Sequence, residues 1–272
     1  MKKIIYYLIP CVCSLLIIGC TKEDQAIENS EEATLQHILE LTNTFLKTQD
    51  KITTSAKAID PAIAKIDITA FLDSYGGPNS SDDDLNDAYA DGIAASYKAA
   101  EGVAPPNPGG NVDNTANAYD YVGKYHVDIL DYQIRNKSNY VSPNNVFKYN
   151  RSIGVTSDYL AQDQIQLNMT NMMSNNQFDM WYLHLQQQLQ TANGLISQTI
   201  LAMEAAGKIS TLESNILYHY FDAQENASSL TNFIQYSIQI EDIIINSSYN
   251  HPTKRFLLSA MATARHDFNY WQ

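Results

Sequence analysis

Apolar residues recur at helical spacing through most of this chain, whereas the two-residue alternation typical of β-strands is almost absent. The longest run covers residues 177–206, where apolar side chains keep to one helical face for about seven turns. This run predicts a single helix that ends at Gly207, because glycine readily adopts the left-handed backbone found at helix ends. Ser210 and Glu213 have the spacing of a capping box and predict the start of a second long helix. Two long helices joined by so short a turn must lie antiparallel.

The predicted fold class is therefore all-α: an antiparallel helical bundle with a long C-terminal helical hairpin and a more irregular N-terminal helical part. Residues 104–111 contain three prolines and two glycines, which exclude a regular element there. We place a Pro/Gly loop at residues 105–111, between an N-terminal helical part (31–104) and the bundle (112–272). Both parts are expected to belong to one domain.

A stripe of small residues marks the helix expected over about residues 84–101. Ala88, Gly92, Ser96 and Ala99 fall on one face of this helix. Such a stripe allows a neighbouring helix to approach closely. Acidic residues in the same segment, among them Asp87 and Asp91, exclude a membrane span.

The N-terminus has the pattern of a secretory signal peptide over residues 1–19. Lys2 and Lys3 precede an apolar stretch, residues 4–18, that is too short for the ~30 Å hydrocarbon core of a bilayer. It ends in Leu-Ile-Ile-Gly-Cys at residues 16–20, which resembles the lipobox of bacterial lipoproteins. The resemblance implies that Cys20 becomes the first residue of the mature chain and carries a diacylglycerol and an N-acyl chain. Several acyl chains would anchor the protein firmly to a membrane, and no other cofactor is predicted.

Residues 20–30 are polar and acidic and are expected to form a tether. Within it, Lys22, Glu23 and Asp24 resemble the export signal of Bacteroidota surface lipoproteins. The resemblance implies a lipoprotein of the outer membrane that faces the cell exterior. A charged linker without export function would leave the protein on the periplasmic face, so this alternative stays open.

Charge and cysteine usage exclude several classes of function. The formal net charge is −13, and it becomes −15 once Lys2 and Lys3 are removed with the signal peptide. No Lys/Arg cluster follows residue 3, so a nucleic-acid partner is excluded. All three cysteines lie in the first twenty residues, which excludes disulfides, thiol catalysis and cysteine-ligated zinc from the body.

The candidate metal ligands are two pairs of residues, His126 with Asp128 and His219 with Asp222. Histidine and carboxylate side chains bind transition metals. His219 and Asp222 stand one helical turn apart and so share a face, whereas His126 is only near Asp128 in the sequence. None of the six histidines belongs to an HExxH motif. A metal-binding protein or a metal-dependent hydrolase is therefore kept as the alternative function. The competing interpretation is that these are partly buried histidines with one nitrogen satisfied.

The candidate binding residues are Tyr121, Tyr125 and Trp181, because amphipathic aromatic side chains are common in interfaces and on sugar-binding surfaces. Residues 119–132 also resemble a tyrosine-rich segment of secreted or lipid-anchored bacterial proteins of unknown function. No nucleophile, phosphate-binding or dinucleotide-binding motif is present in the sequence. The sequence thus predicts a lipid-anchored, non-enzymatic binding or accessory protein with a protein or glycan partner.

Overall fold

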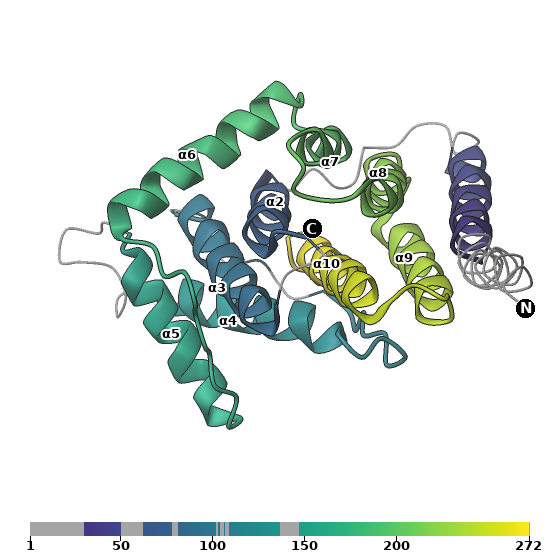
Figure 1. Ribbon diagram of the computed structural model, residues 1–272. Helices are drawn as coiled ribbons and strands as arrows, with labels where there is room; N and C mark the ends of the chain where they lie inside the picture. The colour runs from purple at the N-terminus through teal and green to yellow at the C-terminus, as the bar shows by residue number, and fades with distance from the viewer. Residues whose placement is uncertain are drawn as a thin grey trace, which may run out of the picture.

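A computed structural model describes residues 30–49, 62–77, 81–101, 103, 106, 109–136 and 147–271. All regular secondary structure in these residues is helical, and the helices pack as a bundle (Figure 1). The prediction of an all-α bundle is therefore confirmed. The signal peptide, Cys20 and the Lys22-Glu23-Asp24 segment lie outside the described residues.

Helix α10 (His251–Tyr270) occupies the centre of the bundle. It contacts α2 (Ala62–Tyr75), α4 (Asp120–Arg135), α8 (Thr211–Glu225) and α9 (Leu230–Ile245). Sixteen of its residues are buried, so almost its whole circumference is covered by neighbours. A helix in this position must satisfy any charged side chain with partners from the helices around it.

Helix α3 (Asp82–Ala99) packs closely on α2 through the predicted small-residue stripe. Ala88 and Ser96 are fully buried. A Cβ atom added at Gly92 would lie 3.1 Å from His126 Cε1 and 3.2 Å from Asp67 Oδ1. The stripe therefore lets two polar side chains from α2 and α4 come against the backbone of α3.

Helices α5 (Tyr149–Gln162) and α6 (Asn175–Thr191) run along the outer edge of the bundle (Figure 1). They enclose a second hydrophobic cluster with α3, in which the Tyr149 and Phe178 rings stack at 4.7 Å between centroids. The Lys98 ammonium lies 5.0 Å from the centre of the Tyr182 ring, a favourable cation–π distance.

The predicted long C-terminal hairpin is wrong in length, because each of its helices is divided. Residues 177–206 form α6 and α7 (Ile196–Ala205), separated at Asn193 and Gly194, whose φ angles are +55° and +74°. These left-handed residues end α6 in the way expected of Gly207, which has a φ of +70°. The capping box of Ser210 and Glu213 is confirmed, and α7 packs against α8 across this turn.

The second half of the predicted hairpin is divided in the same manner. Helix α8 ends at Glu225, and α9 begins at Leu230 after an N-cap at Ser229. The Ser229 hydroxyl accepts a hydrogen bond from the Asn232 amide at 3.2 Å. Such a cap satisfies a free amide at the first turn and allows the chain to change direction.

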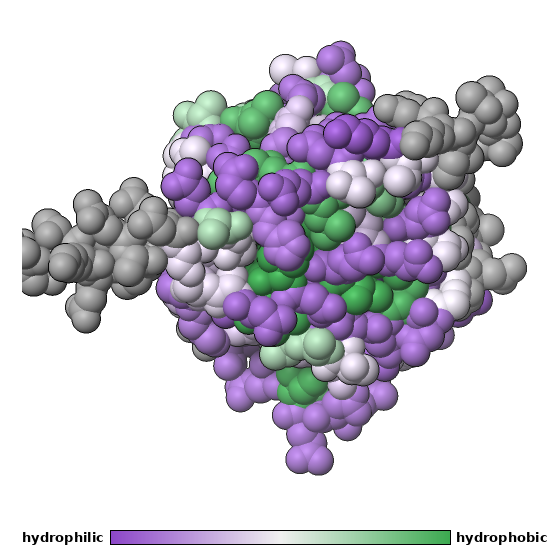
Figure 2. Space-filling model, turned by 90° about the vertical axis from the view of Figure 1, so that its right-hand side faces the viewer, coloured by the Kyte–Doolittle hydropathy of each residue, from purple (hydrophilic) through white to green (hydrophobic). Residues whose placement is uncertain are grey.

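The N-terminal helical segment, residues 30–49, covers α9. Thr42 Oγ1 lies 2.8 Å from the Tyr236 hydroxyl, and the Phe45 and Tyr236 rings are 4.6 Å apart. Figure 2 shows the side of the molecule on which this segment lies, where hydrophilic side chains surround narrow hydrophobic strips. Among the described helices, none combines the length and the apolar character needed to cross a membrane.

The contact between α4 and α10 depends on Gly123. An added Cβ would lie 2.3 Å from the Ala262 carbonyl oxygen and 2.8 Å from His266 Cδ2. We expect Gly123→Ala to lower the free energy of unfolding by about 1–3 kcal/mol, because the two helices must move apart. Urea denaturation would measure this change.

The matched control is Gly154→Ala on the exposed face of α5, where an added Cβ has no neighbour within 4 Å. Alanine favours helix over glycine, so we expect this variant to gain up to about 1 kcal/mol. Equal stability of the two variants would contradict the close contact of α4 and α10.

Candidate functional site

Three consecutive charged or polar residues, Arg265, His266 and Asp267, lie on the central helix α10. Arg265 and Asp267 are fully buried, and His266 is 7% exposed. Successive helical residues point about 100° apart, so the three side chains meet different neighbours. Two polar clusters of the core result, one around Asp267 and one around Arg265.

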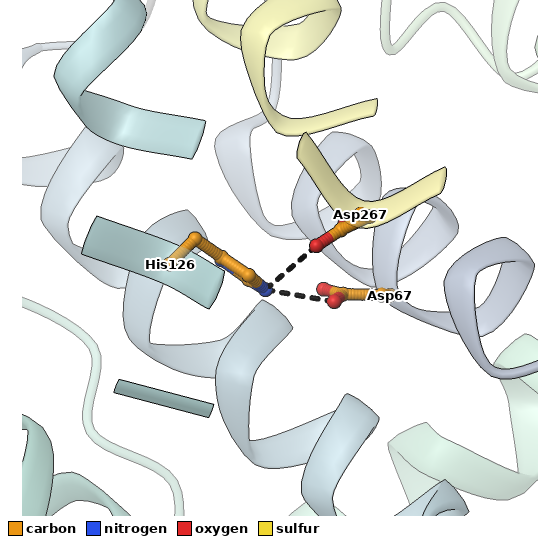
Figure 3. Close-up of side chains that lie close together, drawn as sticks. All are labelled: Asp67, His126 and Asp267. Atoms are coloured by element: carbon orange, nitrogen blue, oxygen red, sulfur yellow. Dashed lines mark hydrogen bonds and ion pairs between the residues drawn. The ribbon is translucent and has the colours of Figure 1, made fainter. Parts of the chain in front are cut away.

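The first cluster, the core triad, consists of Asp67 of α2, His126 of α4 and Asp267 of α10 (Figure 3). All three side chains are fully buried. His126 Nε2 lies 2.7 Å from Asp67 Oδ2 and 3.9 Å from Asp267 Oδ1. Ser96 donates a second hydrogen bond to Asp67 Oδ2 at 2.7 Å.

Several polar atoms of the core triad have no hydrogen-bond partner. They are Asp67 Oδ1, both carboxyl oxygens of Asp267 and His126 Nδ1. Burial and the neighbouring Asp67 carboxylate raise the pKa of Asp267 well above its usual range. In this dry site, two carboxyl groups face a single imidazole. A bound proton or cation would therefore stabilise the site.

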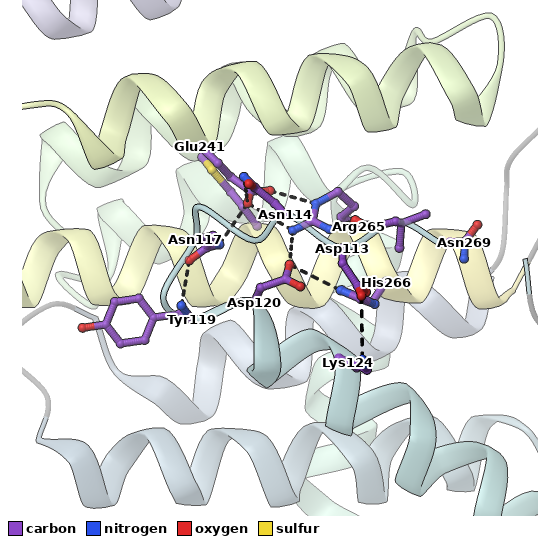
Figure 4. A network of polar contacts seen from close by, with 12 residues as sticks. Asp113, Asn114, Asn117, Tyr119, Asp120, Lys124, Glu241, Arg265, His266 and Asn269 are labelled. Carbon is purple, nitrogen blue, oxygen red and sulfur yellow. Dashed lines mark hydrogen bonds and ion pairs between the residues drawn. The ribbon is translucent and has the colours of Figure 1, made fainter. Parts of the chain in front are cut away.

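The second cluster, the arginine network, is centred on Arg265 (Figure 4). Its Nε donates to Glu241 Oε1 at 2.9 Å, and its Nη2 donates to Glu241 Oε2 at 3.1 Å. The guanidinium also donates to Asp120 and to the Val112 carbonyl. Burial opposes the charge of Arg265, but Glu241 and Asp120 outweigh burial and raise its pKa. This cluster is thus a well-paired buried ion network.

The arginine network also holds the segment that leads into α4. Asn114 and Asn117 donate from their side-chain amides to Glu241 Oε2 at 3.0 and 2.9 Å. Their own side-chain oxygens accept from the backbone amides of Ala116 and Tyr119, as in Asx turns. The non-helical residues 111–119 are therefore positioned by a carboxylate on α9.

Only one of the four predicted metal candidates lies in a cluster of possible ligands. His126 belongs to the core triad, but Asp128 points outward from α4 and is exposed. His219 and Asp222 are partly buried on α8, where the His219 ring packs edge-on against Tyr218. Burial lowers the pKa of His219, and Asp222 offsets this only in part. In the described residues, the groups of three or more possible ligands include neither His219 nor Asp222.

The triad partners Asp67 and Asp267 were missed by the sequence prediction. Asp67 stands among the largely apolar buried residues of α2, whereas Asp267 follows the buried Arg265 and His266 on α10. A charged residue at a core position of an amphipathic helix is the signal that could have identified them.

The predicted aromatic candidates divide between two places. Trp181 lies on α6, and its indole donates to Asp73 Oδ2 at 2.9 Å. This hydrogen bond links α6 to α2. Tyr121 and Tyr125 lie on an exposed face of α4 and line a small apolar cleft with Tyr89 and Leu160. Tyr132, two turns beyond Tyr125, continues this face.

We call the exposed face formed by Tyr121, Tyr125 and Tyr132 of α4 and Tyr159 of α5 the tyrosine strip. Tyr121 is 48% exposed and Tyr132 is 37% exposed. The rings of Tyr132 and Tyr159 are 5.5 Å apart, and Tyr125 donates to Asp163 at 3.0 Å. That hydrogen bond raises the pKa of Tyr125.

Comparisons with protein-family models, with curated proteins and with solved structures give no match, so no property of another protein is carried over to this chain. Function must therefore follow from the chemistry of the core triad and of the tyrosine strip.

The hydrogen bonds of Asp120 predict a pH-dependent contribution to stability. Burial raises the pKa of this carboxyl, but hydrogen bonds from His266 and Arg265 outweigh burial and lower it to about 2. A pKa below the unfolded value of about 3.9 stabilises the fold above that pH, and the contribution is lost as the pH falls towards 2.

We therefore expect Asp120→Asn to lower the free energy of unfolding by about 1–2 kcal/mol at pH 7. The difference from wild type is expected to shrink between pH 5 and pH 2, as measured by urea denaturation at each pH. Asp158→Asn, on an exposed position of α5, is the control and is expected to leave stability at pH 7 unchanged. A difference at Asp120 that stays constant down to pH 2 would contradict the prediction.

Proposed function

We propose that the protein is a lipid-anchored lipoprotein of the outer membrane that binds a partner without converting it chemically. The anchor is supported by the lipobox-like residues 16–20, with Cys20 as the acylated residue. Lys22, Glu23 and Asp24 favour the face towards the cell exterior, and the periplasmic face is the alternative. The acidic helical body would then project from the membrane on the tether.

The tyrosine strip is the observation that carries the binding proposal. Tyr121, Tyr125 and Tyr132 are spaced so that one side of α4 presents them together. Asp128 is exposed on the same side of the helix, and Asp163 accepts from Tyr125. A row of aromatic rings with carboxylates beside it combines stacking surfaces with hydrogen-bond acceptors.

This combination is best suited to a neutral glycan. Aromatic faces pack against the C–H faces of sugar rings, while phenol and carboxylate oxygens match sugar hydroxyl groups. The net charge of −13 disfavours an anionic partner through repulsion. The core triad has no exposed side chain and is out of reach of a macromolecule, so the partner is expected at the surface.

The anchor is tested with Cys20→Ser. We expect this variant to accumulate as unprocessed or soluble precursor, because the acylated thiol is absent, whereas wild type labels with a radioactive fatty acid and fractionates with the outer membrane. Protease added to intact cells is expected to digest wild type but not a variant with Lys22, Glu23 and Asp24 changed to alanine. A Cys20→Ser protein that is still processed and membrane-bound would refute lipidation, and protection of wild type would place it on the periplasmic face.

The binding surface is tested by titrating neutral oligosaccharides, first identified on a glycan array, into the full-length protein in detergent micelles. We expect Tyr121→Ala and Tyr132→Ala each to weaken binding by up to about tenfold, because a stacking ring is lost. Tyr132→Phe keeps the ring and is expected to retain most of the affinity.

Tyr218→Ala, on the distant helix α8, is the matched control and is expected to bind as wild type does. Loss of binding in the control alone, or no glycan binding by wild type, would contradict the proposed surface. A protein partner would instead be indicated if pull-down from cell envelopes depended on the same tyrosines.

A further inference from the structure

The core triad brings together side chains from three helices that are far apart in the sequence. Asp67 comes from α2, His126 from α4 and Asp267 from α10, and Figure 3 shows the His126 nitrogen facing both carboxyl groups. One candidate ligand atom from each residue lies within 4.8 Å of the other two. The glycine at position 92 leaves the space that His126 and Asp67 occupy against α3.

The hydrogen bonds of the triad are incomplete: it holds four of the fourteen buried side-chain nitrogen and oxygen atoms that lack a partner in the described residues. Asp67 Oδ1 and both oxygens of Asp267 are buried and accept no hydrogen bond from any other group, so only a proton shared between the two carboxyl groups can pair them. One turn before Asp267, the buried Thr263 hydroxyl also has no partner. By contrast, both oxygens of Glu241 in the arginine network accept hydrogen bonds, from Arg265 and from Asn114 and Asn117.

Such unpaired carboxyl groups are costly in a dry interior. Each ionised carboxylate loses its hydration on burial, and two close carboxylates also repel each other. The two carboxyl groups face a single imidazole, so the protein alone compensates their charge incompletely. A divalent cation between the two carboxyl groups would supply that compensation and occupy the vacant acceptor positions.

The distances and donor types suit a transition metal. Ligand atoms around a tetrahedral zinc ion at about 2.0–2.2 Å are about 3.2–3.6 Å from one another. The His126 nitrogen lies 2.7 Å from one carboxylate oxygen and 3.9 Å from the other, so an ion requires shifts of less than about 1 Å. Imidazole with carboxylates suits Zn²⁺ or Mn²⁺, whereas Mg²⁺ and Ca²⁺ favour all-oxygen sites.

We propose that Asp67, His126 and Asp267 bind one divalent transition-metal ion, Zn²⁺ or Mn²⁺, which links α2, α4 and α10 inside the bundle. The complete burial of the ligands makes this a structural site, because an external substrate cannot reach the ion. The site is independent of the proposed glycan surface. It stabilises the native fold because the unfolded chain lacks the preformed set of ligands.

The decisive measurement is the metal content of the full-length protein purified from membranes without chelator. We expect about one equivalent of zinc or manganese per chain by mass spectrometry. After chelator treatment, the Tm is expected to fall and to recover when Zn²⁺ or Mn²⁺ is returned. A wild-type protein that holds no metal, takes none up when incubated with either ion and shows no metal-dependent Tm would overturn the proposal.

The variants Asp267→Asn and His126→Gln test whether these two side chains bind the metal. We expect each to lower metal affinity by more than about 100-fold, because loss of an outer-shell partner alone costs 10- to 100-fold. In metal-free protein, Asp267→Asn is expected to be at least as stable as wild type, since the neutral amide does not repel the Asp67 carboxylate. A merely structural aspartate would instead lose stability whether or not metal is present.

His219→Gln on α8 is the matched histidine control and is expected to retain metal and its metal-dependent Tm. Binding of Co²⁺ to wild type gives a further readout, because its visible absorption reports an imidazole–carboxylate ligand field and needs no folded variant. Metal retained by Asp267→Asn but lost from His219→Gln would refute this ligand set.

Discussion

The burial of Arg265, His266 and Asp267 in one central helix is the constraint on which the rest of the bundle depends. Removing ionised groups from water costs several kcal/mol for each, so α10 depends on compensating groups that neighbouring helices bring to defined places. Glu241 on α9 and Asp120 on α4 do so for Arg265. Gly123 lets α4 approach closely enough for these contacts, and two asparagines orient the chain before it.

The two polar clusters on α10 differ in how the charges of their buried side chains are compensated. Around Arg265, donors and acceptors match, and the charges of the guanidinium and the carboxylates offset one another. Around Asp267, two carboxyl groups face a single imidazole, and several oxygens remain without a donor. A balanced network needs nothing from outside the chain, whereas an unbalanced one is stabilised by an added proton or cation. This contrast within one helix is the basis of the metal-site proposal.

A closed core and an open tyrosine strip imply a division of roles. Side chains in the core triad are shielded from solvent, so a metal there would hold three helices together rather than act on an external molecule. The tyrosine strip is accessible and rests on α4, the helix that also carries His126 and Asp120. Stability at the centre would therefore support the geometry of the surface, while the proposed lipid anchor would bring that surface to its partner.

The sequence alone determined the all-α class, the turn at Gly207, the capping box at Ser210 and the close contact through the small-residue stripe, because these follow from local spacing and backbone preference. It suggested His126 but not its partners. The break at Gly194 was missed because the apolar pattern continues across it. Only the tertiary structure decided that Asp67 and Asp267 meet His126. The convergence of side chains from three helices depends on how those helices cross, and the crossing of helices cannot be derived from local periodicity.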